Sequence, residues 1–160
     1  MRLEGSCHCG CVRFSLDASS PVPYLRCFCS ICRKTAGSAG FGINLGGWVK
    51  GMVVEGAKHI CVYDPTGDRT EGSTNGSGRR FCGNCGSPLW NWDGRWPDFI
   101  HPNAGAIDTP LPTPPAHVDM MLGSAVAWAR SGLGEPEKAF NDYPDEALAD
   151  WHQRHGLTSR

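Results

Sequence analysis

The sequence predicts a mainly β domain that spans residues 1–160 and ends in a C-terminal helix. Its 21 glycines and 12 prolines favour short strands joined by turns over long helices. Several short segments alternate apolar and polar residues, and one segment near the C-terminus has helical spacing. With 40% hydrophobic and 19% charged residues, the chain has the composition of a folded protein rather than a disordered one.

Predicted strands follow one another through the first two thirds of the chain. Residues 11–16 alternate around Phe14 and Leu16, and residues 41–45 alternate in the same way, with 49–54 as the next candidate. Residues 59–63 are β-branched and aromatic, and Pro65 marks the end of that strand. Residues 88–92 and 99–107 are weaker candidates.

The remaining segments predict a loop, an extended crossing and the final helix. Residues 66–78 are rich in glycine, serine, threonine and asparagine, which is typical of a loop, and the prolines of 109–115 require an extended chain. The helix is predicted over residues 144–155. Asp145 and Glu146 would lie in its first turn, Leu148 and Trp151 on one face, and Gly156 would end it.

Charge and hydropathy exclude several partner classes. The net charge is −1, from 15 basic and 16 acidic residues, and no block of like charge stands out, so we expect no nucleic acid and no membrane partner. The longest apolar stretch, 120–129, is too short to span a bilayer. The N-terminus has no export signal, so we expect a cytoplasmic protein. Nine cysteines in a reducing compartment indicate metal or redox chemistry rather than disulfides.

Three cysteine motifs carry the chemistry. They are Cys7-x-Cys9-x-Cys11, Cys27-x-Cys29-x-x-Cys32 and Cys82-x-x-Cys85. The last is typical of a zinc knuckle, because two cysteines on a tight turn direct both sulfurs at one metal and Gly86 permits a positive φ. A knuckle supplies two of four ligands. The spacing leaves open whether Cys7 and Cys9 or Cys29 and Cys32 supply the others.

The cysteine count suggests two kinds of site. With Cys11 and Cys61 set aside, the other cysteines divide into four, which would close a structural zinc, and three, which would leave one position for water or substrate. Cys61, between Ile60 and Val62, is interpreted as a small buried hydrophobic residue. Cys11 is either an exchangeable ligand or a strand residue beside the site. The histidines at 8, 59, 101 and 117 lack ligand spacing and are interpreted as structural or surface residues.

The three motifs, in this order, resemble one family. Residues 5–14 (GSCHCGCVRF), 27–32 (CFCSIC) and 80–89 (RFCGNCGSPL) are similar to the glutathione-dependent formaldehyde-activating enzyme family, whose domain is shared with centromere protein V. The similarity continues through 115–118 (PAHV) and Ala127-Trp128. It implies a β-tent fold of folded antiparallel sheets around zinc. Cys11 departs from the family pattern, in which a small apolar residue is usual.

The resemblance also implies how the cysteines are used. It places a structural zinc on Cys7, Cys9, Cys82 and Cys85, and a second, catalytic zinc on Cys27, Cys29 and Cys32. The second site can be partly occupied because solvent faces it. The implied reaction joins glutathione to formaldehyde to give S-hydroxymethylglutathione, or cleaves the carbon–sulfur bond of that adduct. The resemblance therefore implies a carbon–sulfur lyase. Its partner would be a small-molecule thiol.

Three cations flank the middle motif. Arg26, Arg33 and Lys34 are candidate substrate-binding residues, since glutathione is anionic; the alternative is a solvated charged turn. The same motifs are compatible with two rival functions. One is a non-enzymatic zinc-binding module that contacts another protein. The other is a redox protein in which Cys29 and Cys32 cycle between dithiol and disulfide.

Overall fold

The computed structural model describes residues 1–20, 22, 24–65, 78–130 and 137–157. The backbone forms two compact units, and each is built from two separate stretches of chain. Unit 1 comprises Met1–Ala18 and Gly46–Leu111, and unit 2 comprises Ser19–Leu45 and Pro112–Arg160. That residues 1–160 form a single domain stays a prediction. The predicted loop at 66–78 lies outside the described residues except for Gly78, which begins a strand.

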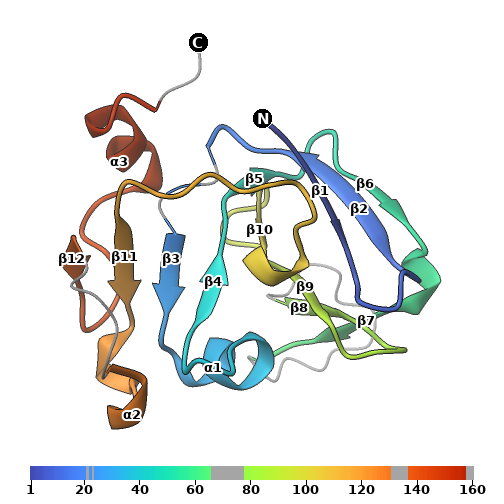
Figure 1. The fold of residues 1–160 in the computed structure, drawn as a ribbon, viewed down its shortest axis with the longest axis horizontal. Helices are drawn as coiled ribbons and strands as arrows, with labels where there is room; N and C mark the ends of the chain where they lie inside the picture. The colour runs from blue at the N-terminus through green and yellow to red at the C-terminus, as the bar shows by residue number, and fades with distance from the viewer. Residues whose placement is uncertain (21, 23, 66–77, 131–136, 158–160) are drawn as a thin grey trace. The chain divides into compact units, whose positions relative to one another are not determined.

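Unit 1 contains two antiparallel sheets (Figure 1). The three-stranded sheet has the order β1 (Arg2–Ser6), β2 (Arg13–Asp17) and β6 (Val53–Glu55). The five-stranded sheet has the order β5 (Gly47–Trp48), β10 (Phe99–Pro102), β9 (Pro88–Trp92), β8 (Gly78–Cys82) and β7 (Ile60–Tyr63). Two short 3-10 helices, η1 (Ala57–His59) and η2 (Ala104–Ala106), complete the unit.

The core of unit 1 is built from the inward-facing residues of these strands. Along β2, Phe14 and Leu16 are buried while the ends of the strand are exposed, as the alternation predicts. The Phe14 ring packs edge-on against Trp90 of β9, with ring centroids 5.0 Å apart. Leu16 lies against the backbone of Gly47, where any side chain would clash. The predicted strand at 11–16 therefore forms, although it begins at Arg13.

Unit 2 contains one mixed sheet in the order β12 (Lys138–Ala139), β11 (His117–Met120), β3 (Tyr24–Cys27) and β4 (Gly42–Asn44). Strand β11 runs parallel to β12 and β3, whereas β4 is antiparallel to β3. A parallel pair needs a long connection, and the chain between β3 and β11 includes the second stretch of unit 1. The mainly β fold is confirmed, with antiparallel sheets in unit 1 and this mixed sheet in unit 2.

The helices of unit 2 are short. They are α1 (Ser30–Ala36), η3 (Leu122–Ser124), α2 (Ala127–Arg130) and α3 (Leu148–Arg154). The predicted C-terminal helix is present, but it begins at Leu148, so Asp145 and Glu146 precede it. The Glu146 carboxylate accepts hydrogen bonds from Lys138 and Arg154. Gly156, at φ +66°, follows the helix as expected. None of the helices in the described ranges is long and apolar enough to cross a membrane.

Helix α3 belongs to the core of unit 2. Trp151 is buried with Val22 and Val118, and Phe140 packs against this cluster. A ring nitrogen of His152 forms a hydrogen bond with the Val22 carbonyl. The C-terminal helix is thus fixed to the residues that precede β3.

Candidate functional site

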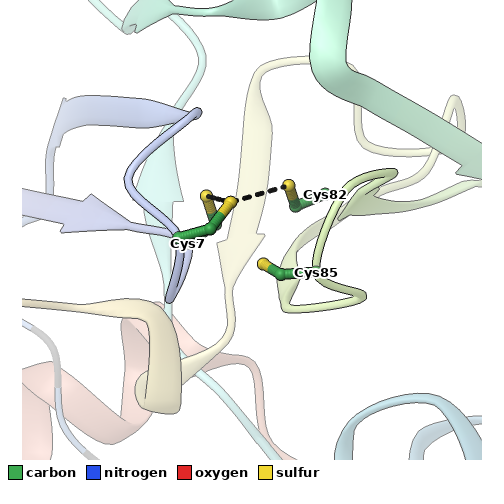
Figure 2. Close-up of side chains that lie close together, drawn as sticks. Cys7, Cys82 and Cys85 are labelled. Carbon is green, nitrogen blue, oxygen red and sulfur yellow. Dashed lines mark hydrogen bonds between the residues drawn. The ribbon is translucent and has the colours of Figure 1, made fainter.

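Four cysteine sulfurs converge in unit 1. Those of Cys7, Cys9, Cys82 and Cys85 all lie within 4.8 Å of one another. Cys9 is 3.5 Å from Cys7 and 3.8 Å from Cys82, sulfur to sulfur. Four thiolates at about 2.3 Å from a tetrahedral zinc would be about 3.8 Å apart, so this donor set fits zinc. Figure 2 shows the side chains of Cys7, Cys82 and Cys85 pointing toward one another.

Two tight turns position these four sulfurs. The first turn links β1 to β2, and the Gly10 N–H donates to the Cys7 carbonyl at 2.9 Å. The second follows β8, and the Gly86 N–H donates to the Cys82 carbonyl at 2.8 Å. Both glycines have a positive φ, +74° and +75°. The His8 N–H donates to the Ser87 hydroxyl at 3.1 Å, which joins the two turns.

Polar groups beside two of the four sulfurs, those of Cys9 and Cys85, favour the thiolate form. The Asn84 side-chain amide donates to the Cys9 sulfur at 3.2 Å, and this bond lowers the pKa of Cys9 to about 5. The hydroxyl of Ser87 lies 3.2 Å from the Cys85 sulfur and lowers the pKa of that thiol to about 7. Sequence reasoning missed Asn84 and Ser87. Their positions inside and just after the knuckle could have indicated them, since partners that orient metal ligands often lie there.

Three further sulfurs converge in unit 2. Those of Cys27, Cys29 and Cys32 lie within 4.8 Å of one another. Cys27 ends β3, and Cys29 is the N-cap of α1, where its sulfur accepts a hydrogen bond from the Cys32 N–H at 3.3 Å. Within the described parts of the chain, no histidine, aspartate, glutamate or further cysteine completes this group. The set fits a zinc site with three protein ligands and one position for another molecule.

Among these three thiols, that of Cys29 is deprotonated most readily. Hydrogen bonds from the Cys27 and Cys32 side chains lower the pKa of Cys29 far below its ordinary value, and the bond with Cys29 raises the pKa of Cys27. The Asn44 amide donates to the Cys32 sulfur at 3.5 Å. Asn44 lies in β4 and not in the cysteine motif, so no sequence signal indicated it.

Arg26 is not part of a solvated turn. It lies in β3 and is buried, and its guanidinium donates to the Asp119 carboxylate through Nε and through Nη2, the latter at 2.9 Å. It also lies over the Phe41 ring, 5.5 Å from the centroid. The solvated-turn alternative is wrong for Arg26, because β3 is an interior strand and Asp119 is its register partner on β11. Asp119 is 93 positions away, so local sequence could not reveal it.

Arg33 and Lys34 lie in helix α1 rather than in a turn. Lys34 is exposed, whereas Arg33 is half-buried. The Arg33 Nε is shielded from solvent and has no hydrogen-bond partner among the residues that the structure describes. Of the three candidate cations, Arg33 is therefore the one with a buried donor still to satisfy.

All nine cysteines are free of disulfides. Cys61 is exposed, so its interpretation as a buried hydrophobic residue is wrong. It lies on β7, an edge strand whose Val62 and Tyr63 are also exposed. Cys11 is half-buried and lies before β2, with its sulfur 3.9 Å from the Asn84 amide nitrogen.

Comparison with known proteins identifies the family. The family model described as "Glutathione-dependent formaldehyde-activating enzyme" matches residues 2–121, which include both cysteine groups. A protein of Halomonas elongata named "Putative glutathione-dependent formaldehyde-activating enzyme" is 48% identical over 157 residues, which is 98% of each chain. A crystal structure of a Rhodobacter sphaeroides protein shares the fold, with a TM-score of 0.52 and 24% identity over 70% of this chain and 92% of that one. This chain belongs to the glutathione-dependent formaldehyde-activating enzyme family.

Proposed function

We propose that this protein is a carbon–sulfur lyase that forms and cleaves a thiol–formaldehyde adduct, with S-hydroxymethylglutathione as the adduct and glutathione as the thiol. The observation that carries the proposal is the convergence of three sulfurs, from Cys27, Cys29 and Cys32, with no fourth protein ligand among the described residues. Membership of the family supports it. The second, four-cysteine group supports it too, because that group can serve the fold and leave the three-cysteine site for chemistry.

The reaction balances without an oxidant or a reductant. A bond forms between the thiol sulfur and the carbonyl carbon, and the thiol proton ends on the carbonyl oxygen; cleavage reverses both changes. Zinc held by Cys27, Cys29 and Cys32 would supply a Lewis acid that favours the thiolate form of the incoming thiol. The chain itself orients two of the three ligands: the Asn44 amide donates to the Cys32 sulfur, and the Arg26–Asp119 pair fixes the strand that ends at Cys27.

Arg33 is proposed to bind a carboxylate of the thiol substrate. An unpaired buried N–H costs free energy, and a carboxylate would satisfy it. A hydrogen bond to a charged group contributes about 1.5–3 kcal/mol, so Arg33→Met should raise KM by roughly tenfold to a hundredfold with little change in kcat. Lys34→Met, on the exposed side chain next to it, is the matched control and should change KM less than about threefold. If the two substitutions raise KM equally, Arg33 does not have the proposed role in binding the substrate carboxylate.

The proposed activity is tested by exchange kinetics. Exchange between glutathione, formaldehyde and their adduct is followed by two-dimensional NMR, with the uncatalysed rate measured in the same buffer. The wild type should accelerate exchange, while Cys29→Ser, with its zinc in the four-cysteine site retained, should not. Cys61→Ser is the control, because Cys61 is exposed and belongs to neither group. Wild-type exchange at the uncatalysed rate would refute the proposal.

Calorimetry separates the rival functions if exchange is not accelerated. Binding of glutathione without catalysis would indicate a carrier of the adduct, and no binding would indicate a protein-interaction module. Reversible loss of two thiols on mild oxidation, confined to Cys29 and Cys32, would indicate the redox protein.

We also propose a cytoplasmic location without nucleic-acid or membrane partners. Nine free cysteines support that location, and a net charge of −1 supports the absence of those partners.

A further inference from the structure

The four-cysteine site has a fifth thiol beside it. Cys11 follows Cys9 by two positions, and the Asn84 amide nitrogen reaches both sulfurs, at 3.2 Å from Cys9 and 3.9 Å from Cys11. Cys11 does not lie within 4.8 Å of every other sulfur, so the structure shows four converging ligands and one neighbour.

Cys11 lies beside an exposed ligand of the site, Cys9. Cys7 and Cys82 are buried, with exposed fractions of 2% and 0%, and their sulfurs cannot leave without opening the core. Cys9 and Cys85, in contrast, are exposed, and of these two Cys9 is the one that shares the Asn84 amide with Cys11. The Cys11 backbone is fixed, because its carbonyl packs against Gly56 so closely that a side chain there would clash. Rotation of the Cys11 side chain is therefore the movement that brings its sulfur toward the position of Cys9.

We infer that Cys11 is a reserve ligand of the four-cysteine zinc site, which can replace Cys9 but not Cys7 or Cys82. In the exchange the Cys9 sulfur leaves the metal and takes up a proton, while the Cys11 thiol loses its proton to solvent and binds. No electron is transferred, and the number of thiolates on the metal is unchanged. Such a site would tolerate loss or chemical modification of Cys9.

Zinc content and thiol accessibility test this inference independently of enzyme activity. Cys9→Ser should keep the zinc content of the wild type, whereas Cys9→Ser/Cys11→Ser should contain one zinc fewer per chain. In addition, alkylation by iodoacetamide, followed by mass spectrometry, should modify Cys11 in the zinc-loaded wild type and spare it in Cys9→Ser. The exposed Cys61 gives the internal reference, since its alkylation rate should be the same in both proteins.

Two controls fix the interpretation. Cys11→Ser alone should leave the zinc content unchanged, and Cys82→Ser should lose one zinc although Cys11 is present. The inference is overturned if Cys9→Ser loses that zinc, or if Cys11 in Cys9→Ser is alkylated as fast as in the wild type. Should the double variant prove insoluble, the alkylation result for Cys9→Ser decides by itself. Because the readouts concern the four-cysteine site, failure here leaves the proposed activity untouched, and the reverse also holds.

Discussion

Removing the carboxylate of Asp119 would leave the Arg26 guanidinium buried without a counter-charge. Only 10% of the Arg26 side chain and 9% of the Asp119 side chain are exposed, so solvent cannot replace the lost partner. Breaking such a pair costs about 3–5 kcal/mol, which is a large share of the 5–15 kcal/mol that stabilises a typical domain. We expect Asp119→Asn to lower the free energy of unfolding by about that amount.

The measurement is urea denaturation of zinc-saturated protein, followed by tryptophan fluorescence. Asp17→Asn is the matched control: Asp17 pairs with Arg2 at 3.3 Å, but 58% and 40% of these side chains are exposed, so the loss should be below about 1 kcal/mol. Arg26→Met/Asp119→Leu removes both charges and should be near neutral, because no unpaired charge stays buried. A loss below about 1 kcal/mol for Asp119→Asn would refute the reasoning.

Three further predictions concern the metal, one glycine and one carboxylate. Cys82→Ser should lose the zinc of the four-cysteine site and much of the folded protein, and mild chelation of the wild type should first remove the zinc of the three-cysteine site. Gly56→Ala should destabilise by about 2–5 kcal/mol, because φ is +73° and the new Cβ would meet the Cys11 carbonyl. Hydrogen bonds from Arg154 lower the pKa of Glu146 to about 2 from 4.5, so its contribution to stability is present above about pH 4.5 and is lost as the pH falls toward 2.

Each of these outcomes has its own check. Elemental analysis measures the zinc content of Cys82→Ser, and the melting temperature measures its stability. Simultaneous release of both metals in one unfolding step would contradict the existence of two distinct sites. Gly156→Ala, at φ +66° in open space, should cost only about 1–2 kcal/mol, and an equal cost at Gly56 would exclude the clash. For Glu146, the stability difference between wild type and Glu146→Gln should shrink as the pH falls from 6 to 3; a constant difference would rule out the ion pairs as its source.

The sequence by itself determined the features that depend on neighbouring residues. Alternation around Phe14 and Leu16 predicted a strand with one buried face, and β2 buries those residues. The spacing Cys82-x-x-Cys85 with Gly86 predicted a tight turn with a positive φ, and Gly86 has φ +75°. Gly156 marked the end of the last helix. In each case the physical cause lies within a few residues of the signal.

The tertiary structure decided what depends on distant partners. Spacing left the partners of the knuckle open, and the fold brings Cys7 and Cys9 to it because the β1–β2 turn meets the turn after β8. Arg26 was a candidate substrate-binding residue with a solvated turn as the alternative, but an interior strand buries it against Asp119.

The same limit applies to Cys61 and to the C-terminal helix. Cys61 lies in an apolar pattern, yet β7 is an edge strand and leaves it exposed, because burial depends on which neighbour covers a strand. Glu146 has the residue type of a first helical turn, but the helix begins at Leu148, and Glu146 pairs with Lys138 and Arg154 instead. Local pattern sets the tendency of a segment, and packing against residues far along the chain sets its environment.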